Sequence, residues 1–302
     1  MSTLDFPSML EMDPETITLS DIDISHIDLW KKDKKWGFFK RLRDEAPVHY
    51  CKSSEYGPFW SITRFEDILE VERNWEIFSS YPRISIADPV EDSNFSAPTF
   101  IAMDPPKHDE QRKTVQGVVA PPNLKELEGT IRSRAGDILD DLPLNKTFDW
   151  VDRVSIELTT QMLATLFDFP YHDRRKLTRW SDVVFARLGE GIIESNEQRQ
   201  NELLECLDYF SKLWKEREKD PTGNDFVSMM IRGDATRNLS PQEYLGNILL
   251  LIVGGNDTTR NSISGGVLAL NQHPKEYQKL RENPALIPNM VSEIIRWVTP
   301  LA

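Results

Sequence analysis

A short polar segment that could do chemistry interrupts an apolar stretch late in the chain. Residues 248–253 are all apolar, and Gly-Gly-Asn-Asp-Thr-Thr follows directly at 254–259. Two adjacent glycines inside a helix cost about 1 kcal/mol each relative to alanine. Buried Asp and Thr side chains add a desolvation cost unless they are paired. A functional site therefore explains this segment better than chance.

The residue types suggest what such a site would do. Gly254 lacks a side chain, so a flat cofactor or ligand can lie against the helix backbone. The Thr258 hydroxyl can bond to the Gly254 carbonyl, four residues back, and loosen the helix. Water or dioxygen could occupy the resulting slot, and Asp257 could relay protons into it. On spacing alone, a Gly-Gly packing contact beside a kink explains the segment equally well.

Two charged pairs accompany this segment. His108 and Arg112 follow Asp-Pro-Pro and share one face of a predicted helix near its N-terminus, where they could clamp an anion with help from the helix dipole. Glu293 and Arg296 lie three apart on another predicted helix, and such a surface pair contributes only about 0.2–0.5 kcal/mol. Each pair alone is more typical of a solvated helix face than of a site.

Periodicity predicts the elements that position these residues. One hairpin is expected over 48–63, and residues 84–101 read as a long irregular loop, a kind that is usually functional. The long helix at 240–272 begins at a Ser cap with Pro241 and Glu243, and its stretch 249–253 should be buried nearly all round. The other helices are expected at 34–45, 65–74, 107–119, 123–141, 151–167, 172–188, 197–219, 225–231, 274–282 and 287–298.

Composition excludes several classes of protein. The 302 residues are 39% hydrophobic and 28% charged, which is typical of a globular protein, and a net charge of −13 argues against nucleic acid as a partner. We find no signal peptide and no apolar run long enough for a membrane span, so we expect a soluble cytoplasmic protein and not an integral membrane protein. Cys51 and Cys206 are isolated and form neither a disulfide framework nor a zinc site.

Taken in order and spacing, the three motifs resemble those of the cytochrome P-450 family, from about Trp36 to the end of the chain. The resemblance implies a mainly α (α+β) fold with a small N-terminal β region. It implies an oxidoreductase that uses haem b (iron protoporphyrin IX), dioxygen and electrons from NAD(P)H delivered by partner proteins. It also implies that Asp257 and Thr258 are catalytic, and that Glu293 and Arg296 are structural. The implied haem-binding residues are His108, Arg112, Gly254 and Gly255.

One departure from the family pattern is evident. The Phe-x-x-Gly-x-x-x-Cys-x-Gly loop of the family lies well downstream of its Glu-x-x-Arg motif, whereas this sequence ends at Ala302. Neither Cys51 nor Cys206 has that context, so we expect no axial metal ligand in this chain and no working haem site in the polypeptide as given. The expected domains are an N-terminal arm at 1–30 and an incomplete P-450 domain at 31–302.

Residues 250–262 look particularly like the bacterial subfamily that hydroxylates medium-chain n-alkanes and fatty acids at the terminal carbon. That resemblance implies a hydrophobic small-molecule substrate, and a 2Fe–2S ferredoxin with its ferredoxin reductase as electron donors. Basic residues that could meet an acidic ferredoxin are Lys107, Arg112, Lys113 and Lys125. The expected substrate pocket is apolar, with walls from Ile84, Ile86, Val90, Phe95, Phe100, Leu250 and Val253.

Two other function classes remain open at this stage. A terpene synthase-like, magnesium-dependent enzyme would need acid-rich motifs on facing helices, but Arg260 stands where such a motif needs Ser or Thr, and no Asp-rich partner motif appears. The other alternative is an all-α ligand-binding or interaction protein without catalysis. Magnesium-dependent release of pyrophosphate would favour the first, and a cysteine loop in the downstream coding sequence would exclude both.

Overall fold

A computed structural model describes residues 9–86 and 97–300 of the chain. The chain divides into two compact units, one of Met1–Asn94 with Ile101–Asp104 and one of Phe95–Phe100 with Pro105–Ala302. Helices dominate, and the described residues hold one sheet of two strands. This is the α-rich fold with a small β region that the sequence predicts.

The described part of the first unit contains the sheet and three α-helices. β1 (Val48–Cys51) pairs antiparallel with β2 (Phe59–Ile62), and Val48 lies opposite Ile62. The Gly57 backbone has φ +81° in the connecting turn, a value that glycine adopts without strain. The remaining elements of this unit are η1 (Met9–Glu11), η2 (Leu19–Asp21), α1 (Ile27–Lys31), α2 (Trp36–Glu45) and α3 (Phe65–Arg73), while the short η3 (Phe100–Ala102) spans the division.

The N-terminal segment differs from the extended arm that the sequence predicts. Met9, Ile22 and Leu29 are buried in one apolar cluster with Phe38 and Leu42 of α2. The apolar residues before position 31 are too sparse to show helical or strand periodicity, but each burial removes apolar surface from water. Residues 9–30 therefore fold as part of the first unit, and no boundary falls at residue 31.

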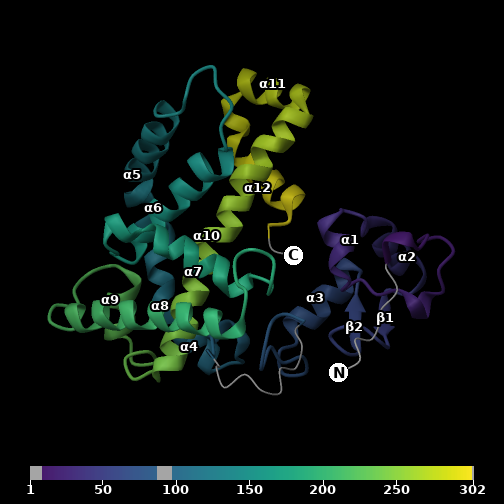
Figure 1. Cartoon of the computed structure of the whole chain (residues 1–302), viewed down its shortest axis with the longest axis horizontal. Helices are drawn as coiled ribbons and strands as arrows, with labels where there is room; N and C mark the ends of the chain where they lie inside the picture. The colour runs from purple at the N-terminus through teal and green to yellow at the C-terminus, as the bar shows by residue number, and fades with distance from the viewer. Residues whose placement is uncertain (1–8, 87–96, 301–302) are drawn as a thin grey trace. The chain divides into compact units, whose positions relative to one another are not determined.

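The second unit is a set of helices around α10 (Pro241–Gln272), which runs through its middle (Figure 1). α10 packs against α6, α7, α8, α11, α12 and the π-helix η5. The other helices of this unit begin and end close to the predicted positions. They are α4 (Lys107–Gln116), η4 (Gly117–Val119), α5 (Pro121–Asp140), η5 (Val151–Ile156), α6 (Glu157–Leu166), η6 (Tyr171–Asp173), α7 (Arg175–Phe185), α8 (Asn196–Arg217), α9 (Phe226–Arg232), α11 (Pro274–Glu282), η7 (Pro284–Leu286) and α12 (Ile287–Val298).

α10 begins as the sequence predicts. The Ser240 hydroxyl accepts from the Glu243 backbone N–H, and the Glu243 carboxylate accepts from the Ser240 backbone N–H, which is a complete capping box. The burial prediction for 249–253 is wrong in part. Leu249 and Ile252 are buried, whereas Leu250, Leu251 and Val253 are half-buried. One side of the helix is therefore not covered by the described residues.

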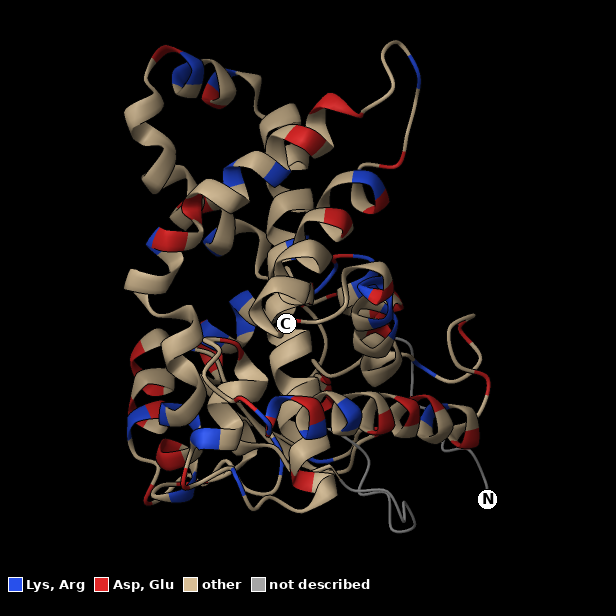
Figure 2. Cartoon of the chain, turned by 90° about the vertical axis from the view of Figure 1, so that its left-hand side faces the viewer, with Lys and Arg blue, Asp and Glu red and all other residues tan. Residues whose placement is uncertain are grey.

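Two further observations concern the whole chain. Basic and acidic residues are interspersed along the helices, without segregation into blocks of one sign in the view of Figure 2. No helix within residues 9–86 or 97–300 combines the length and the apolar character that a membrane span requires.

Candidate functional site

The open side of α10 carries the residues that the sequence singled out. Leu250, Gly254 and Thr258 recur every four residues and therefore share one stripe of the helix. Gly254 is exposed, and a Cβ placed there would meet no described heavy atom within 4 Å. The Thr258 hydroxyl donates to the Gly254 carbonyl at 2.8 Å, which is the hydrogen bond that the spacing predicts. This stripe offers a flat, mainly apolar surface with one hydroxyl at its end.

The other side of the same segment is tightly packed against α6. A Cβ at Gly255 would lie 2.6 Å from Leu163 Cδ2, so Gly255 permits a close approach of the two helices. Asn256 is fully buried, and its Oδ1 accepts from the Thr159 hydroxyl at 2.9 Å. The adjacent glycines thus meet different surroundings, because successive helix residues point about 100° apart. The position of Gly255 favours a packing role over the expected contact with the cofactor.

Asp257 faces α7 and lies in a polar group of four residues, three of them charged. Its carboxylate accepts from the Ser181 hydroxyl at 3.3 Å and forms an ion pair with Arg260, which also contacts the Asp182 carboxylate at 3.1 Å. Burial raises the pKa of Asp257; Arg260 opposes this rise and the Asp182 charge adds to it. A carboxyl group with a raised pKa exchanges protons closer to neutral pH, which suits a proton relay.

His108 and Arg112 lie one turn apart on α4, as predicted. The His108 ring contacts the Phe100 carbonyl oxygen through Nδ1 at 2.9 Å, and its Nε2 lies 4.0 Å from the Asp109 carboxylate. Arg112 is exposed, and within the described ranges its guanidinium has no hydrogen-bond or ion-pair partner. α4 begins at Lys107 without a side-chain cap, so its first backbone N–H groups remain available beside His108.

The expected pocket residues fall into three groups. Leu250 and Val253 are half-buried on α10, and Phe100 is buried beside it in the second unit. Ile84 and Ile86 are exposed and belong to the first unit, whereas Val90 and Phe95 lie outside the described residues. That these seven residues line one substrate pocket stays a prediction.

Glu293 and Arg296 form a two-pronged ion pair on α12, at 2.7 and 2.6 Å. Both side chains are exposed, and the hydrogen bonds from Arg296, together with its charge, lower the pKa of Glu293. The neighbouring Ile294 approaches Gly266 of α10 closely enough that a Cβ there would lie 2.8 Å from Ile294 Cδ1. The pair therefore lies on a helix that is fixed to α10, and its structural role stays a prediction.

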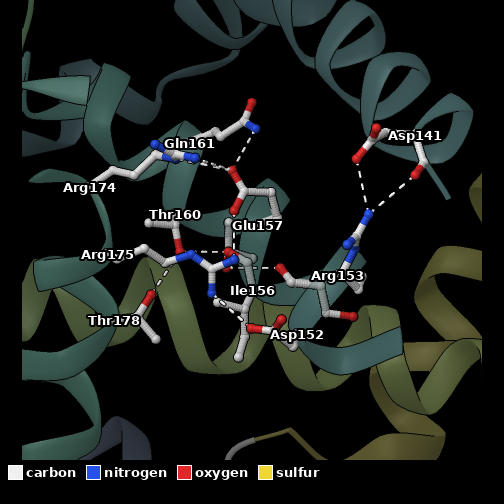
Figure 3. Close-up of polar contacts among 12 residues, drawn as sticks. Asp141, Asp152, Arg153, Ile156, Glu157, Thr160, Gln161, Arg174, Arg175 and Thr178 are labelled. Atoms are coloured by element: carbon white, nitrogen blue, oxygen red, sulfur yellow. Dashed lines mark hydrogen bonds and ion pairs between the residues drawn. The ribbon is translucent and has the colours of Figure 1, made fainter. Parts of the chain in front are cut away.

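Sequence reasoning missed a second charged group, on the α5, η5, α6 and α7 side of the unit (Figure 3). Glu157 accepts from Gln161 at 2.8 Å, from Arg174 at 3.0 Å and from Arg175 at 2.7 Å. These residues, with Asp152, line a cavity of about 430 Å³. The only sequence signal was an excess of Arg and Asp in short stretches, which is equally typical of a solvated surface.

The open side of α10 is compatible with the predicted haem, because Gly254 leaves space beside an apolar helix surface and the Arg112 cation has no partner among the described residues. The two cysteines, in contrast, do not suit the role of an axial thiolate ligand. Cys206 is fully buried in α8, and burial raises its pKa well above the usual value. Burial also raises the pKa of Cys51, which lies in β1 of the other unit and donates to the Ser53 carbonyl at 3.5 Å. Burial therefore disfavours the thiolate form of both cysteines, which is the form that binds iron.

A magnesium-dependent alternative has no support in the described residues, which contain no group of three or more His, Cys, Asp or Glu side chains placed to hold a metal ion.

Comparison with known proteins agrees with the family resemblance seen in the sequence. A family model described as cytochrome P-450 matches residues 133–286. A solved structure of cytochrome P-450-153 from Novosphingobium aromaticivorans is 43% identical with a TM-score of 0.85, and the match covers 93% of this chain and 71% of that one.

Two curated relatives extend the comparison. Linalool 8-monooxygenase of Pseudomonas putida is 29% identical over 289 residues, which cover 92% of this chain and 71% of the relative. A methyl-branched lipid omega-hydroxylase of Mycobacterium tuberculosis is 26% identical over 301 residues, which cover 95% of this chain and 70% of the relative. These matches extend over nearly the whole chain.

Proposed function

Because this chain belongs to the cytochrome P-450 family of monooxygenases, we propose that it hydroxylates the terminal carbon of medium-chain n-alkanes or fatty acids. Enzymes of the family use haem b, dioxygen and electrons from NAD(P)H that partner proteins deliver. The observation that carries the proposal is the open stripe of α10, where Gly254 leaves room beside Leu250 and the Thr258 hydroxyl closes one end.

The residues of this chain have distinct tasks in that reaction. When bound, the haem supplies the insertion of one oxygen atom into a C–H bond. Gly254 provides the flat surface, and His108 and Arg112 hold the negatively charged groups of the cofactor. The Thr258 hydroxyl holds a proton next to the Gly254 carbonyl. Asp257, whose pKa burial raises, passes protons inward from its contacts with Ser181 and Arg260.

The apolar lining supports the choice of substrate class. Leu250, Val253 and Phe100 offer no charged group to hold a polar substrate. Each buried methylene contributes about 0.8 kcal/mol, so affinity alone selects chain length only loosely. Selectivity for the terminal carbon needs a narrow channel that admits the methyl end first. The similarity to a lipid omega-hydroxylase, a protein named for terminal oxidation, agrees with this choice.

A 2Fe–2S ferredoxin with its ferredoxin reductase is the proposed electron donor. Arg112, Lys113 and Lys125 are exposed basic residues on α4 and α5, and they could meet an acidic partner. Lys107 is less available, because its ammonium already pairs with Glu243 at 2.6 Å. The net charge of the chain is −13, so these cations stand out against an acidic background.

The substitution Gly254→Phe tests the proposed function. A Cβ at Gly254 would meet no described heavy atom within 4 Å, so we expect the chain to fold while the ring occupies the haem or substrate surface. We expect terminal hydroxylation of n-octane and dodecanoic acid to fall by at least roughly tenfold, or about 1.4 kcal/mol in barrier, in a haem-loaded enzyme that contains these residues together with an axial cysteine. Gas chromatography of the products measures this.

Leu268→Phe is the matched control, because Leu268 is also exposed on α10 but lies more than three turns away. It should leave turnover unchanged. Unaltered product formation in Gly254→Phe, or hydroxylation away from the chain terminus in the unsubstituted enzyme, would contradict the proposal.

A further inference from the structure

Asn247 lies at the centre of a buried hydrogen-bonded chain that the sequence motifs do not include. Its Oδ1 accepts from the Phe100 backbone N–H at 2.9 Å, and its Nδ2 donates to Gln111 Oε1 at 2.8 Å. Asn247 and Gln111 are each 1% exposed. One side chain of α10 therefore connects the end of the long loop with α4, which carries His108 and Arg112.

Gly246 allows the loop to come this close. A Cβ at Gly246 would overlap the backbone carbonyl groups of Ala97 and Pro98, and backbone atoms cannot move aside as the end of a flexible side chain can. Gly246 lies four residues before Leu250 and eight before Gly254, on the same stripe of α10. The loop end thus covers the beginning of the stripe whose open part is the candidate site.

The carbonyl group of Phe100 in turn holds the ring of His108. A carbonyl oxygen can only accept a hydrogen bond, so the ring nitrogen that lies 2.9 Å from the Phe100 oxygen must carry the proton. His108 is therefore held with Nδ1 protonated, and Nε2 is the ring nitrogen left to face a ligand. Phe100 packs edge-on against the same ring, with the ring centres 6.1 Å apart.

We propose that Asn247 is a positioning residue of the monooxygenase site. It fixes the Phe100 backbone, and the Phe100 carbonyl accepts from Nδ1 and so fixes the orientation of the His108 ring. Nε2 is thereby directed to the negatively charged group of the cofactor, to which it donates when it also carries a proton. This inference rests on the proposed function for the role of His108, but the hydrogen-bonded chain itself is a property of this polypeptide. It can be tested without haem.

Three substitutions separate positioning from general stability. Asn247→Leu has a similar volume and removes both hydrogen bonds. Asn247→Asp keeps the acceptor for the Phe100 N–H, and Gln111 can turn its amide to donate to the new carboxylate. Gly246→Ala removes no hydrogen-bonding group but displaces the loop end. The control Thr160→Val removes a buried hydrogen bond between α6 and α7, where Thr160 and Thr178 hydroxyls lie 2.7 Å apart.

The readout is the His108 ring in the 302-residue chain labelled with ¹⁵N-histidine. Long-range ¹H–¹⁵N spectra at alkaline pH, where imidazole rings are neutral, distinguish the two tautomers, and His108→Gln assigns the signal among five histidines. The unsubstituted chain should show a protonated Nδ1 protected from solvent exchange. Asn247→Leu and Gly246→Ala should reduce that protection at least roughly tenfold, whereas Asn247→Asp and Thr160→Val should retain it.

Retention of the signal in Asn247→Leu, or equal loss in Asn247→Asp or Thr160→Val, would overturn the proposal. If circular dichroism shows that Asn247→Leu does not fold, Gly246→Ala and Asn247→Asp decide between the same outcomes. Failure of the proposed function is distinguishable, because it would appear as unchanged turnover in Gly254→Phe while the His108 spectra still follow Asn247.

Discussion

Two adjacent glycines on α10 show how strongly surroundings decide the meaning of a residue. A Cβ added at Gly254 would meet no described atom within 4 Å, whereas a Cβ added at Gly255 would meet the buried Leu163. Glycine in a helix interior costs about 1 kcal/mol relative to alanine. Replacing it with alanine therefore stabilises the fold only where the added methyl group fits.

We therefore predict opposite effects for the two alanine substitutions. Gly254→Ala should raise the free energy of unfolding by up to about 1 kcal/mol. Gly255→Ala should lower it, by on the order of 1 kcal/mol, because the added methyl group must displace Leu163 in a packed interior. Urea denaturation of both variants measures the difference. Equal stabilisation by the two substitutions would show that Gly255 is not a packing contact.

The raised pKa of Asp257 predicts how the stability of the fold depends on pH. Its pKa is raised in the folded chain, chiefly by burial, so the folded state binds a proton more readily than the unfolded chain does. Stability then falls as pH rises from the ordinary carboxyl pKa through the raised one. Asp257→Asn should therefore be more stable than the unsubstituted chain at neutral pH, and the difference should shrink in acid.

Thermal unfolding at neutral and acid pH measures this difference. Asp182→Asn is the control, because it removes the other carboxylate that contacts Arg260 at 3.1 Å and so tests the loss of that pairing alone. A destabilised Asp257→Asn at every pH would mean that the ion pair with Arg260 outweighs the burial of the charge.

At the scale of the elements, ion pairs as well as packing hold the start of α6 in place. The chain runs from the π-helix η5 into α6, and Glu157 at the start of α6 holds two arginines that come from α7 and the residue before it (Figure 3). Burial alone would raise the pKa of Glu157, but the hydrogen bonds from Gln161 and Arg174 and the charges of both arginines lower it.

A lowered carboxyl pKa stabilises the fold above the ordinary pKa, and this contribution is lost as pH falls through the lowered value. Glu157→Gln should therefore reduce the free energy of unfolding at neutral pH by on the order of 1–3 kcal/mol, with a smaller effect in acid. The exposed pair of Lys176 and Glu205 is the matched comparison, since Glu205→Gln should cost less than about 1 kcal/mol. Equal losses would show that Glu157 acts as a surface charge.

At the scale of the whole molecule, the surface of α10 that we propose faces a haem is not accompanied by a thiol suited to bind iron among Cys51 and Cys206. Both thiols are buried and have raised pKa values. We predict that the 302-residue chain, mixed with haem and dithionite under carbon monoxide, gives no Soret band of the thiolate type. The variant with both Cys51→Ser and Cys206→Ser should give the same spectrum. A thiolate band that disappears in this variant would identify one of the two as a ligand.

The sequence by itself determined what depends on neighbouring residues. The capping box at Ser240, the break at His273-Pro274 and the bounds of α11 and α12 follow from local propensities, and the structure has them where predicted. The bond from Thr258 to the Gly254 carbonyl also follows, because helix geometry places residues four apart side by side. His108 and Arg112 share a helix face for the same reason.

Only the tertiary structure decided which side of α10 is open, since that depends on where α6 and α7 pack and not on the period of α10. The packing of Gly255 against Leu163 was decided in the same way. So were the hydrogen bonds of Asn247 to Phe100 and Gln111, and the ion pairs of Glu157 with Arg174 and Arg175. The tertiary structure also folded residues 9–30 onto α2. Each of these contacts joins segments that lie apart in the sequence, and their pairing is selected by burial and charge in three dimensions, which no local pattern records.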